Sequence, residues 1–560
     1  MFERLREREH RSDGKYHGLS AAWRVVRYDY GVVFILFVLG GALALIYLRA
    51  NPGGRFVYDD SYITLTFARN LLRYGKFTFD GVHASGGATS PLHVVLIALF
   101  ALITRRIETA TFLLGALSLQ LAGTFAYYWS REVTQSRKIA LVSSLLLITS
   151  GWMVFDALSG LETVLFLALL LLALFLFEKR SLWFGLPLAL CVTTRPDAAF
   201  FVAGLAAYVL IRFVAALLSR KTGDAAPISR PGTVPEFSSR KPGTVPSARP
   251  WLFGAGIFAL VLVPFLIYNS ATTGSLLPAT GLAKTYFFGE IDDPLPAKLS
   301  HFWVGVKFFY AHLVMFWPAL VALGLIFARK LWRHYYWLLA AIAFYPVYLW
   351  LYPGSTMHYW CRYQHIFIPF LMLAIAEGSF VLVRLLTSWI KDPRAVRILS
   401  WALGGFIAVM LSINQVQSLS NERRIYAASA RSTEEVGEEV ARLIRNHSRP
   451  GDVVATHDIG AIAWFSDRPV LDLVGLVNPE VRELYRNPET GKVIPIGFDG
   501  QRDVYHYLLE RNPTFLVIFA DWKRFIGFSP DQDTSHFTFL GESKPPYPSR
   551  FGGYRIYGVK

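Results

Sequence analysis

Charged side chains are scarce in this chain of 560 residues: Asp, Glu, Lys and Arg make up 17% of it, whereas 53% is hydrophobic. A soluble protein of this length would carry more charge and fewer long apolar runs. Cysteine is also nearly absent. The two that occur, Cys191 and Cys361, provide neither a disulfide framework nor the ligand spacing of a transition-metal site. The composition therefore indicates an integral membrane protein.

Acidic residues are outnumbered by basic ones, 40 to 56, which gives a net charge of +16. No nucleic-acid partner is expected, because the basic residues cluster at the ends of apolar runs and in the segment Arg4–Arg27, as in cytoplasmic flanks of membrane helices. Residues 1–30 are therefore predicted to be a basic cytoplasmic segment. The run Gly31–Leu48 lacks a small-residue cleavage site, so we expect a retained anchor rather than a signal peptide.

Apolar runs of membrane length predict an all-α polytopic bundle over residues 31–415, with about eleven transmembrane helices. The short run 91–104 is expected to be a re-entrant or interfacial helix. If it crosses the bilayer instead, another segment must fail to cross. The predicted crossings are 31–49, 109–129, 139–155, 162–177, 183–194, 198–217, 251–270, 312–328, 335–352, 365–387 and 397–415.

The distribution of Lys and Arg predicts the orientation of the bundle in the plasma (inner) membrane. Basic segments at 178–180, 218–250, 329–334 and 391–397 are expected on the cytoplasmic side with the N-terminus. This assignment leaves 50–108, 156–161, 271–311, 353–364 and everything after 415 outside. Segment 218–250 is rich in Pro, Ser and Gly and repeats PGTVP, so we expect a disordered linker with no catalytic part.

The composition changes after residue 415, and residues 420–560 are predicted to form a small extracytoplasmic α/β domain. Glu422–Asn446 has the pattern of a charged amphipathic helix. The predicted strands are 452–456, 470–474, 514–519 and 554–559, and the predicted helices between them are 460–465 and 503–511.

The most informative feature is the pair Asp59-Asp60, which follows the first apolar run by about ten residues. Carboxylates at a membrane surface are costly unless they have a use. The pair opens the stretch Asp59–Leu72, which is predicted to be a helix lying along the membrane. Asp59 and Asp60 are the candidate catalytic residues.

Other polar candidates fall in the remaining external segments. A carboxylate at the outer leaflet can act as general base towards an acceptor hydroxyl that attacks a sugar's anomeric carbon. Cationic side chains can hold a departing phosphate, Arg by a bidentate fork and Lys as a point charge. The candidate substrate-binding residues are Glu162, Lys284, His358, Tyr359, Arg362 and Tyr363.

Each candidate also has a purely structural interpretation. Asp59-Asp60 and Glu162 could cap the helices that follow them. Lys284 and Arg362 could be interfacial anchors whose side chains snorkel, which is the better explanation for Lys284. Arg195-Pro196-Asp197 is expected to be a self-satisfied ion pair at a helix break. His457-Asp458 resembles a dyad, but a turn at a strand end explains it equally well.

The ordered set of motifs resembles the GT-C superfamily, polytopic glycosyltransferases that use polyprenyl-phosphate sugars, and most resembles its bacterial branch of cell-wall arabinofuranosyltransferases. The segment 458–479 also resembles the external domain of that branch. The motifs are Asp59-Asp60, Ser159–Thr163, Arg195–Asp197, Thr273–Thr280 leading to Lys284, and Arg362-Tyr363 ahead of Pro369.

This resemblance implies a catalytic Asp, a donor delivered on a lipid carrier, a glycan or cell-wall acceptor, and inversion at the anomeric carbon. In the superfamily's pattern the first Asp is the usual base, but the sequence does not decide between Asp59 and Asp60. Some branches use a divalent cation. Asp59, Asp60 and Glu162 could together bind Mg²⁺ or Mn²⁺, but no metal is assigned.

Two other functions remain open at this stage. A lipid or solute transporter or flippase would carry ionisable residues in mid-membrane and two related halves. In this chain the strongest charges fall in loops, and no repeat relates the two halves. A sensor or assembly scaffold would bind a cell-wall ligand through residues 420–560. Sugar transfer is the function that the carboxylate pair favours.

Overall fold

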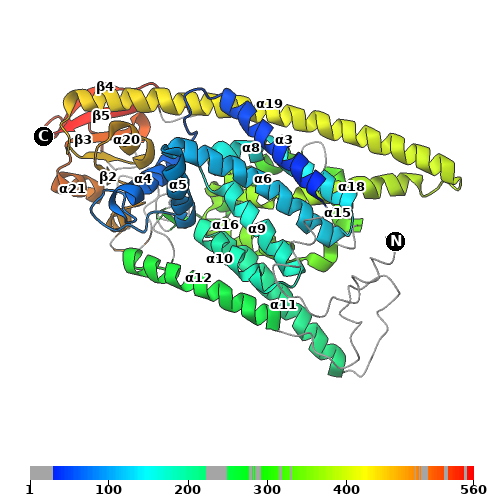
Figure 1. Ribbon diagram of the computed structural model, residues 1–560. Coiled ribbons are helices and arrows are strands. Elements are labelled where there is room, and N and C mark those ends of the chain that lie inside the picture. The colour runs from blue at the N-terminus through cyan, green and yellow to red at the C-terminus, as the bar shows by residue number, and fades with distance from the viewer. Residues whose placement is uncertain are drawn as a thin grey trace.

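Figure 1 shows an elongated molecule with a helical bundle at one end and a small domain containing a β-sheet at the other. Helix α19 (Pro393–His447; yellow) runs along both parts. The predicted fold class, a helical bundle with a small C-terminal α/β domain, is confirmed at this level. This computed structural model describes residues 29–221, 249–276, 280–281, 283, 292–314, 318–327, 331–485, 487, 489–490, 492, 502–522, 528–547 and 552–560.

The bundle is built from apolar helices that pack around one large core of aliphatic and aromatic side chains. Besides α19, its helices are α3 (Tyr30–Arg49), α6 (Ile107–Thr134), α7 (Arg137–Ile148), α8 (Gly151–Leu158), α9 (Thr163–Glu178), α10 (Gly185–Thr194), α11 (Ala198–Lys221), α12 (Arg249–Thr273), α14 (Leu295–Val314), α15 (Pro318–Phe327), α16 (Tyr336–Leu351) and α18 (Ile368–Thr387).

The number of crossings was predicted as eleven. Of the helices in the described part of the chain, six are long and apolar enough to cross a membrane, or up to seven if the bent pair α7 and α8 forms one span. Five more apolar helices of 10–17 residues, α9 and α16 among them, are shorter than a usual span. The helices thus support a multi-pass protein, whereas the count of eleven is not confirmed.

One predicted boundary differs from the structure. The last predicted span and the predicted helix Glu422–Asn446 are one continuous helix, α19, because no Gly or Pro interrupts residues 406–436. The change in composition at residue 415 therefore falls inside a helix. The predicted span 312–328 covers the last described residues of α14 and all of α15, and residues 315–317 between them lie outside the described residues. Segments 1–28 and 222–248, which include most of the predicted linker, lie outside the described residues.

The C-terminal domain, comprising the second half of α19 and the residues that follow, has a five-stranded sheet of order β2-β1-β3-β5-β4. The central strand β3 is buried along all five residues. All four predicted strands are confirmed, and one strand, β4, was not predicted. After α19, the helices and strands of the C-terminal domain are β1 (Val454–Thr456), α20 (Ile459–Ser466), β2 (Val470–Asp472), α21 (Arg502–Arg511), β3 (Phe515–Phe519), β4 (Phe537–Glu542) and β5 (Tyr554–Val559).

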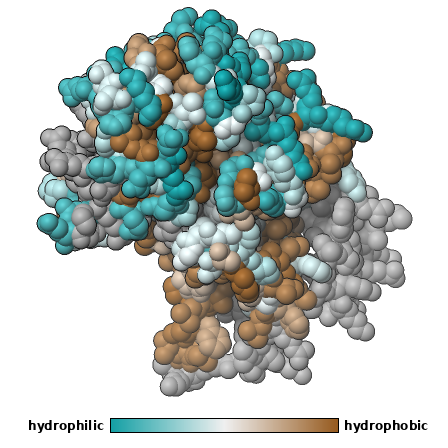
Figure 2. Space-filling model, turned by 90° about the vertical axis from the view of Figure 1, so that its left-hand side faces the viewer, coloured by the Kyte–Doolittle hydropathy of each residue, from teal (hydrophilic) through white to brown (hydrophobic). Residues whose placement is uncertain are grey.

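Pairing in this sheet is mixed. Strand β1 pairs in parallel with β2 and β3, and β5 pairs antiparallel with β3 and β4. Figure 2, seen from the end that carries this domain, shows hydrophilic side chains gathered over it and hydrophobic ones below, over the membrane helices. The domain thus presents the surface expected of a part that lies in water.

Two short helices lie between the bundle and the C-terminal domain (Figure 1). Helix α4 (Asp59–Tyr74) is the predicted interfacial helix, and both Asp residues are in its first turn. Helix α5 (Pro91–Thr104) has 14 residues, about 21 Å of helix, which is less than the hydrocarbon core of about 30 Å. Its length therefore favours the predicted re-entrant or interfacial position over a crossing.

Candidate active site

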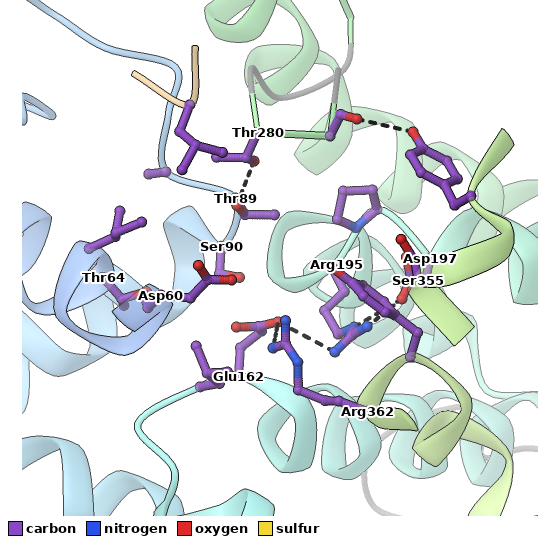
Figure 3. A pocket seen from close by; sticks show the side chains of 18 of the residues that line it. Asp60, Thr64, Thr89, Ser90, Glu162, Arg195, Asp197, Thr280, Ser355 and Arg362 are labelled. Atoms are coloured by element: carbon purple, nitrogen blue, oxygen red, sulfur yellow. Dashed lines mark hydrogen bonds and ion pairs between the residues drawn. The ribbon is translucent and has the colours of Figure 1, made fainter. Parts of the chain in front are cut away.

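A cavity of about 310 Å³ lies where the bundle meets the C-terminal domain (Figure 3). Its lining combines side chains that lie far apart in the sequence. The predicted external segments contribute Asp60, Ser90, Glu162, Thr280 and Arg362, and the C-terminal domain contributes Leu476. The structure therefore brings several of the predicted external polar residues to one place, although Asp59, His358 and Tyr359 are not among them.

A buried carboxylate, Glu162, sits between two guanidinium groups of this cavity. Its Oε1 is 3.2 Å from Nη1 of Arg362 and 3.4 Å from Nη1 of Arg195. All three residues are at most 6% exposed, so the ion pairs are shielded from water. The Glu162 side chain makes no capping bond to α9, which leaves the ionic contacts as its observed role.

Arg195 is held by further partners. Its Nε donates to Asp197 Oδ2 over 3.2 Å, and Nη2 pairs with the same oxygen. Asp197 also accepts a hydrogen bond from the Tyr348 hydroxyl at 3.2 Å. The predicted ion pair at the helix break is therefore present, but it also lines the cavity. The sequence offered no signal for Tyr348, which reaches this site from α16.

The adjacent residues Asp59 and Asp60 have different surroundings. Asp60 lines the cavity, and Figure 3 shows it on the same side as Thr64 and Ser90, across from Arg195. Asp59 does not line it. Its carboxylate accepts the backbone N–H groups of Gly460 and Ala461 at 3.0 and 2.6 Å. Burial, helped by the nearby charge of Asp458, raises the pKa of Asp59 well above its ordinary value.

The fourth external segment contains a strained turn directly before Arg362. Tyr359, Trp360 and Cys361 have positive φ values of 46°, 60° and 65°, a conformation that side chains with a Cβ rarely adopt. Packing offsets the strain: the Tyr359 ring stacks on that of Tyr58, with centroids 4.1 Å apart. The turn thus links Arg362 to Tyr58, the residue directly before Asp59.

The remaining predicted residues of this segment divide into two groups. Tyr363 lines the cavity, and its ring centroid is 5.3 Å from Cζ of Arg362 and 5.4 Å from Cζ of Arg195. These are cation–π distances. His358 and Tyr359 do not line the cavity; their rings pack against one another, with centroids 3.9 Å apart and a tilt of 38°.

Lys284, the predicted cation of the third segment, lies outside the described residues. The same segment does provide Thr280, whose hydroxyl is 2.6 Å from that of Thr89. The buried side chains of His365 and Asp156, which do not line the cavity, pair at 2.6 Å. Sequence reasoning did not connect these two residues, because 209 positions separate them.

The suggested Mg²⁺ or Mn²⁺ site on Asp59, Asp60 and Glu162 does not fit this geometry. Both oxygens of Asp59 accept backbone N–H groups, and Glu162 faces two guanidinium groups. Across the described residues, no group of three or more His, Cys, Asp or Glu side chains is arranged to hold a metal ion. No metal is therefore assigned a place among these residues.

Comparisons with known proteins bear on the fold. The family described as "Domain of unknown function (DUF8728)" matches residues 423–556, nearly the whole C-terminal domain. No sequence among the curated proteins matches the chain.

Solved structures match over nearly the full length. ArnT from Cupriavidus metallidurans, bound to undecaprenyl phosphate, is 12% identical with a TM-score of 0.52, covering 94% of this chain and 98% of its own. The oligosaccharyltransferase of Archaeoglobus fulgidus, tethered to an acceptor peptide, is 12% identical with a TM-score of 0.53, covering 95% and 74%. At this identity the likeness concerns the fold, and it confirms the fold that the sequence resemblance predicted.

The arabinofuranosyltransferase AftD from Mycobacteria is 14% identical with a TM-score of 0.43, covering 93% of this chain and 41% of AftD. That score is too low to support any conclusion about the sugar. The arabinofuranosyl branch therefore stays a prediction.

Proposed function

We propose that this chain, whose fold is that of the GT-C glycosyltransferases, moves a sugar from a polyprenyl-phosphate donor to a glycan acceptor outside the cytoplasm. The observation that carries the proposal is the placement of one carboxylate, Asp60, and one guanidinium, Arg362, in the lining of the same cavity. A reaction with a phosphate leaving group needs a base that removes the acceptor's proton and a cation that binds the phosphate. The two residues meet these needs from one cavity.

Asp60 is the proposed general base. Its neighbour Asp59 is a poor candidate, because both of its oxygens accept backbone N–H groups from α20 and its side chain is outside the cavity lining. With its oxygens engaged by α20 and its side chain outside the cavity lining, this carboxylate is not placed to take a proton from a substrate bound in the cavity. This choice departs from the superfamily's usual pattern, in which the first Asp is the base.

In the proposed step the acceptor hydroxyl oxygen attacks the anomeric carbon of the sugar while Asp60 takes the hydroxyl proton. The bond between that carbon and the phosphate oxygen breaks, and its electron pair leaves with the phosphate. The products are the glycosylated acceptor, polyprenyl phosphate and protonated Asp60, which returns its proton to water. Attack opposite the leaving group inverts the anomeric configuration. General base catalysis of this kind contributes roughly 10²–10⁴-fold to a rate.

Arg362 is the proposed partner of the phosphate. Arg195 already donates to Asp197, Glu162 and Thr163, so few of its N–H groups are available. Arg362 donates from Nη1 to Glu162, while its buried Nε has no hydrogen-bond partner among the described residues. An Arg guanidinium carries five N–H donors, so Arg362 retains donors for an anion. Glu162 is proposed to hold both guanidinium groups at the cavity.

The location of the reaction follows from the predicted orientation. The C-terminal domain and the cavity are proposed to lie on the outer face of the plasma membrane, where a polyprenyl-linked sugar reaches Asp60 from the lipid. Arabinofuranose is the sugar to test first, on the strength of the sequence resemblance alone.

The test is a transfer assay with purified protein in lipid nanodiscs. A panel of radiolabelled polyprenyl-phosphate sugars is incubated with a cell-wall glycan acceptor, using the full chain and its Asp60→Asn variant. We expect label from one donor to reach the acceptor with the wild-type chain only. Absence of transfer from every donor, together with movement of the labelled lipid between the leaflets of reconstituted vesicles, would reject the proposal and favour a flippase.

A further inference from the structure

Asp59 connects the bundle to the C-terminal domain through the first turn of another helix. Helix α20 begins at Ile459, and its own N-cap residue, Asp458, makes no side-chain capping bond. The Asp458 carboxylate accepts a hydrogen bond from the Tyr554 hydroxyl instead. Asp59 supplies the missing cap from 401 positions away, by accepting the N–H groups of Gly460 and Ala461.

The backbones of α4 and α20 meet directly at this point. A Cβ atom added to Gly460 would lie 2.1 Å from the backbone oxygen of Asp59, closer than any real contact. One turn further along α20, the ring centroid of Trp464 is 4.9 Å from the guanidinium of Arg69, which lies in the second half of α4. The two helices are thus packed as one joint, which we name the α4–α20 joint.

A loop of the same domain reaches the cavity. The buried carboxylate of Asp472, at the end of β2, accepts the backbone N–H groups of Val474, Gly475, Val477 and Asn478 at 2.7–3.3 Å. Four such bonds order the loop 473–478. Its central residue, Leu476, lines the cavity, although no motif in the sequence predicted that contact.

This loop rests on the turn that precedes α5. A Cβ atom added to Gly87, another cavity-lining residue, would lie 2.6 Å from Val477 Cγ1 and 2.8 Å from the backbone oxygen of Leu476. Only glycine allows the loop to approach so closely. The C-terminal domain is therefore part of the cavity wall rather than a separate module.

We propose that Asp59 is a positioning residue: through the α4–α20 joint it holds the loop 473–478 over Asp60, and Leu476 contacts the acceptor there. The inference rests on the proposed sugar transfer. The acceptor is assigned to this wall because the polyprenyl donor arrives from the lipid, whereas the C-terminal domain has the hydrophilic surface of a part that faces water. Asp59 then governs how well the acceptor is bound, and Asp60 governs how fast it reacts.

The test combines hydrogen exchange with steady-state kinetics on the full chain in nanodiscs. In Asp59→Ala we expect the amides of residues 459–461 to exchange about tenfold faster, a change typical of a lost helix cap. The acceptor KM should rise by about the same factor, with kcat reduced much less. Asp59→Asn, which retains one acceptor oxygen, should recover part of both effects. Asp60→Asn is the contrast, with unchanged exchange at 459–461 and kcat reduced at least about 100-fold.

Gly460→Ala is the matched perturbation from the other side of the joint. It should reproduce the rise in acceptor KM, and the double variant Asp59→Ala/Gly460→Ala should be little worse than either single variant, because both disrupt one contact. Leu476→Ala, which leaves the joint intact, should raise the acceptor KM without faster exchange at 459–461. It provides the kinetic test if the joint variants do not fold.

Two results separate this inference from the proposed function. If the wild-type chain transfers no sugar, the proposed function fails, while exchange at residues 459–461 still reports on the joint. If the wild-type chain is active but Asp59→Ala reduces kcat as far as Asp60→Asn, with unchanged acceptor KM and unchanged exchange, the positioning role is wrong. An unchanged acceptor KM in Leu476→Ala would also contradict it.

Discussion

Nη1 of Arg362 lies 3.2 Å from Oε1 of Glu162, and both side chains are almost completely buried. The same oxygen is also the partner of Arg195, so one carboxylate balances two cations at the wall of the cavity. A buried charge without a partner is costly, and the three residues therefore depend on one another. In the proposed reaction this arrangement keeps Arg362 ready for a second anion, the phosphate of the donor.

Replacing Glu162 with Gln should lower stability sharply, because the buried guanidinium of Arg362 then loses its ion-pair partner, whereas Arg195 keeps Asp197. Breaking a buried ion pair from one side costs about 3 kcal/mol or more. The measurement is the thermal midpoint of the purified chain in detergent. The matched control is Glu438→Gln, which removes a partner of Arg55 in a largely exposed pair and should cost less than about 1 kcal/mol. Equal midpoints for the two variants would contradict this view of Glu162.

Arg362→Lys should weaken donor use. Lysine keeps the positive charge but cannot offer the planar fork that binds a phosphate at two oxygens. We expect the donor KM to rise about tenfold or more, and the acceptor KM to change little. Arg384→Lys is the control, since that side chain is exposed in the last turn of α18. A donor KM that stays at the wild-type value would show that Arg362 does not hold the phosphate.

The packing of α6 against α8 predicts the effect of one methyl group. A Cβ atom on Gly115 would lie 1.8 Å from the backbone oxygen of Ala157, so Gly115→Ala should force the helices apart and cost about 1–3 kcal/mol. The same substitution at Gly256 in α12 meets no atom within 4 Å and should cost nothing. Thermal midpoints of the two variants measure the difference. A midpoint for Gly115→Ala equal to that of Gly256→Ala would mean that the helices are not in contact there.

Acid should destabilise the C-terminal domain through His457. Burial beside the rings of Phe519 and Tyr554 lowers the pKa of His457 from 6.5 to about 4. As the pH falls, His457 binds a proton at a higher pH in the unfolded chain than in the folded one. Its effect on the free energy of unfolding is therefore absent above about pH 6.5, grows as the pH is lowered, and levels off below about pH 4. The total loss is on the order of 3 kcal/mol.

The measurement is hydrogen exchange of the strands β1 and β3 between pH 7 and pH 4, corrected for the intrinsic pH dependence of exchange. His457→Phe cannot titrate and should abolish this part of the dependence. If the variant loses as much protection as the wild type over that range, other groups are responsible.

Much of the fold could be predicted because apolar length and period are local properties of the sequence. The helices α3, α4 and α6 and four of the five strands all follow from such patterns. The strand β4 was missed because its sequence, FTFLGE, alternates poorly and is only partly buried. The continuity of α19 could have been found, since no helix-breaking residue separates its two halves.

The lining of the cavity was predictable only in part. Of the predicted site residues, Asp60, Glu162, Arg362 and Tyr363 line it, whereas Asp59, His358 and Tyr359 do not. The division of labour between Asp59 and Asp60 was not predictable, because the partners of Asp59 are 401 and 402 positions away in the sequence. Leu476 was missed for the same reason, since only the docking of two domains makes it part of the cavity.

The most direct test of the account is a single-turnover comparison of Asp60→Asn with its isosteric neighbour Asp59→Asn, at saturating donor and acceptor. We predict that transfer in Asp60→Asn falls at least about 100-fold while the labelled donor still binds, and that Asp59→Asn keeps most of the wild-type rate. A wild-type rate in Asp60→Asn, or a collapse confined to Asp59→Asn, would contradict the assignment of Asp60 as the base.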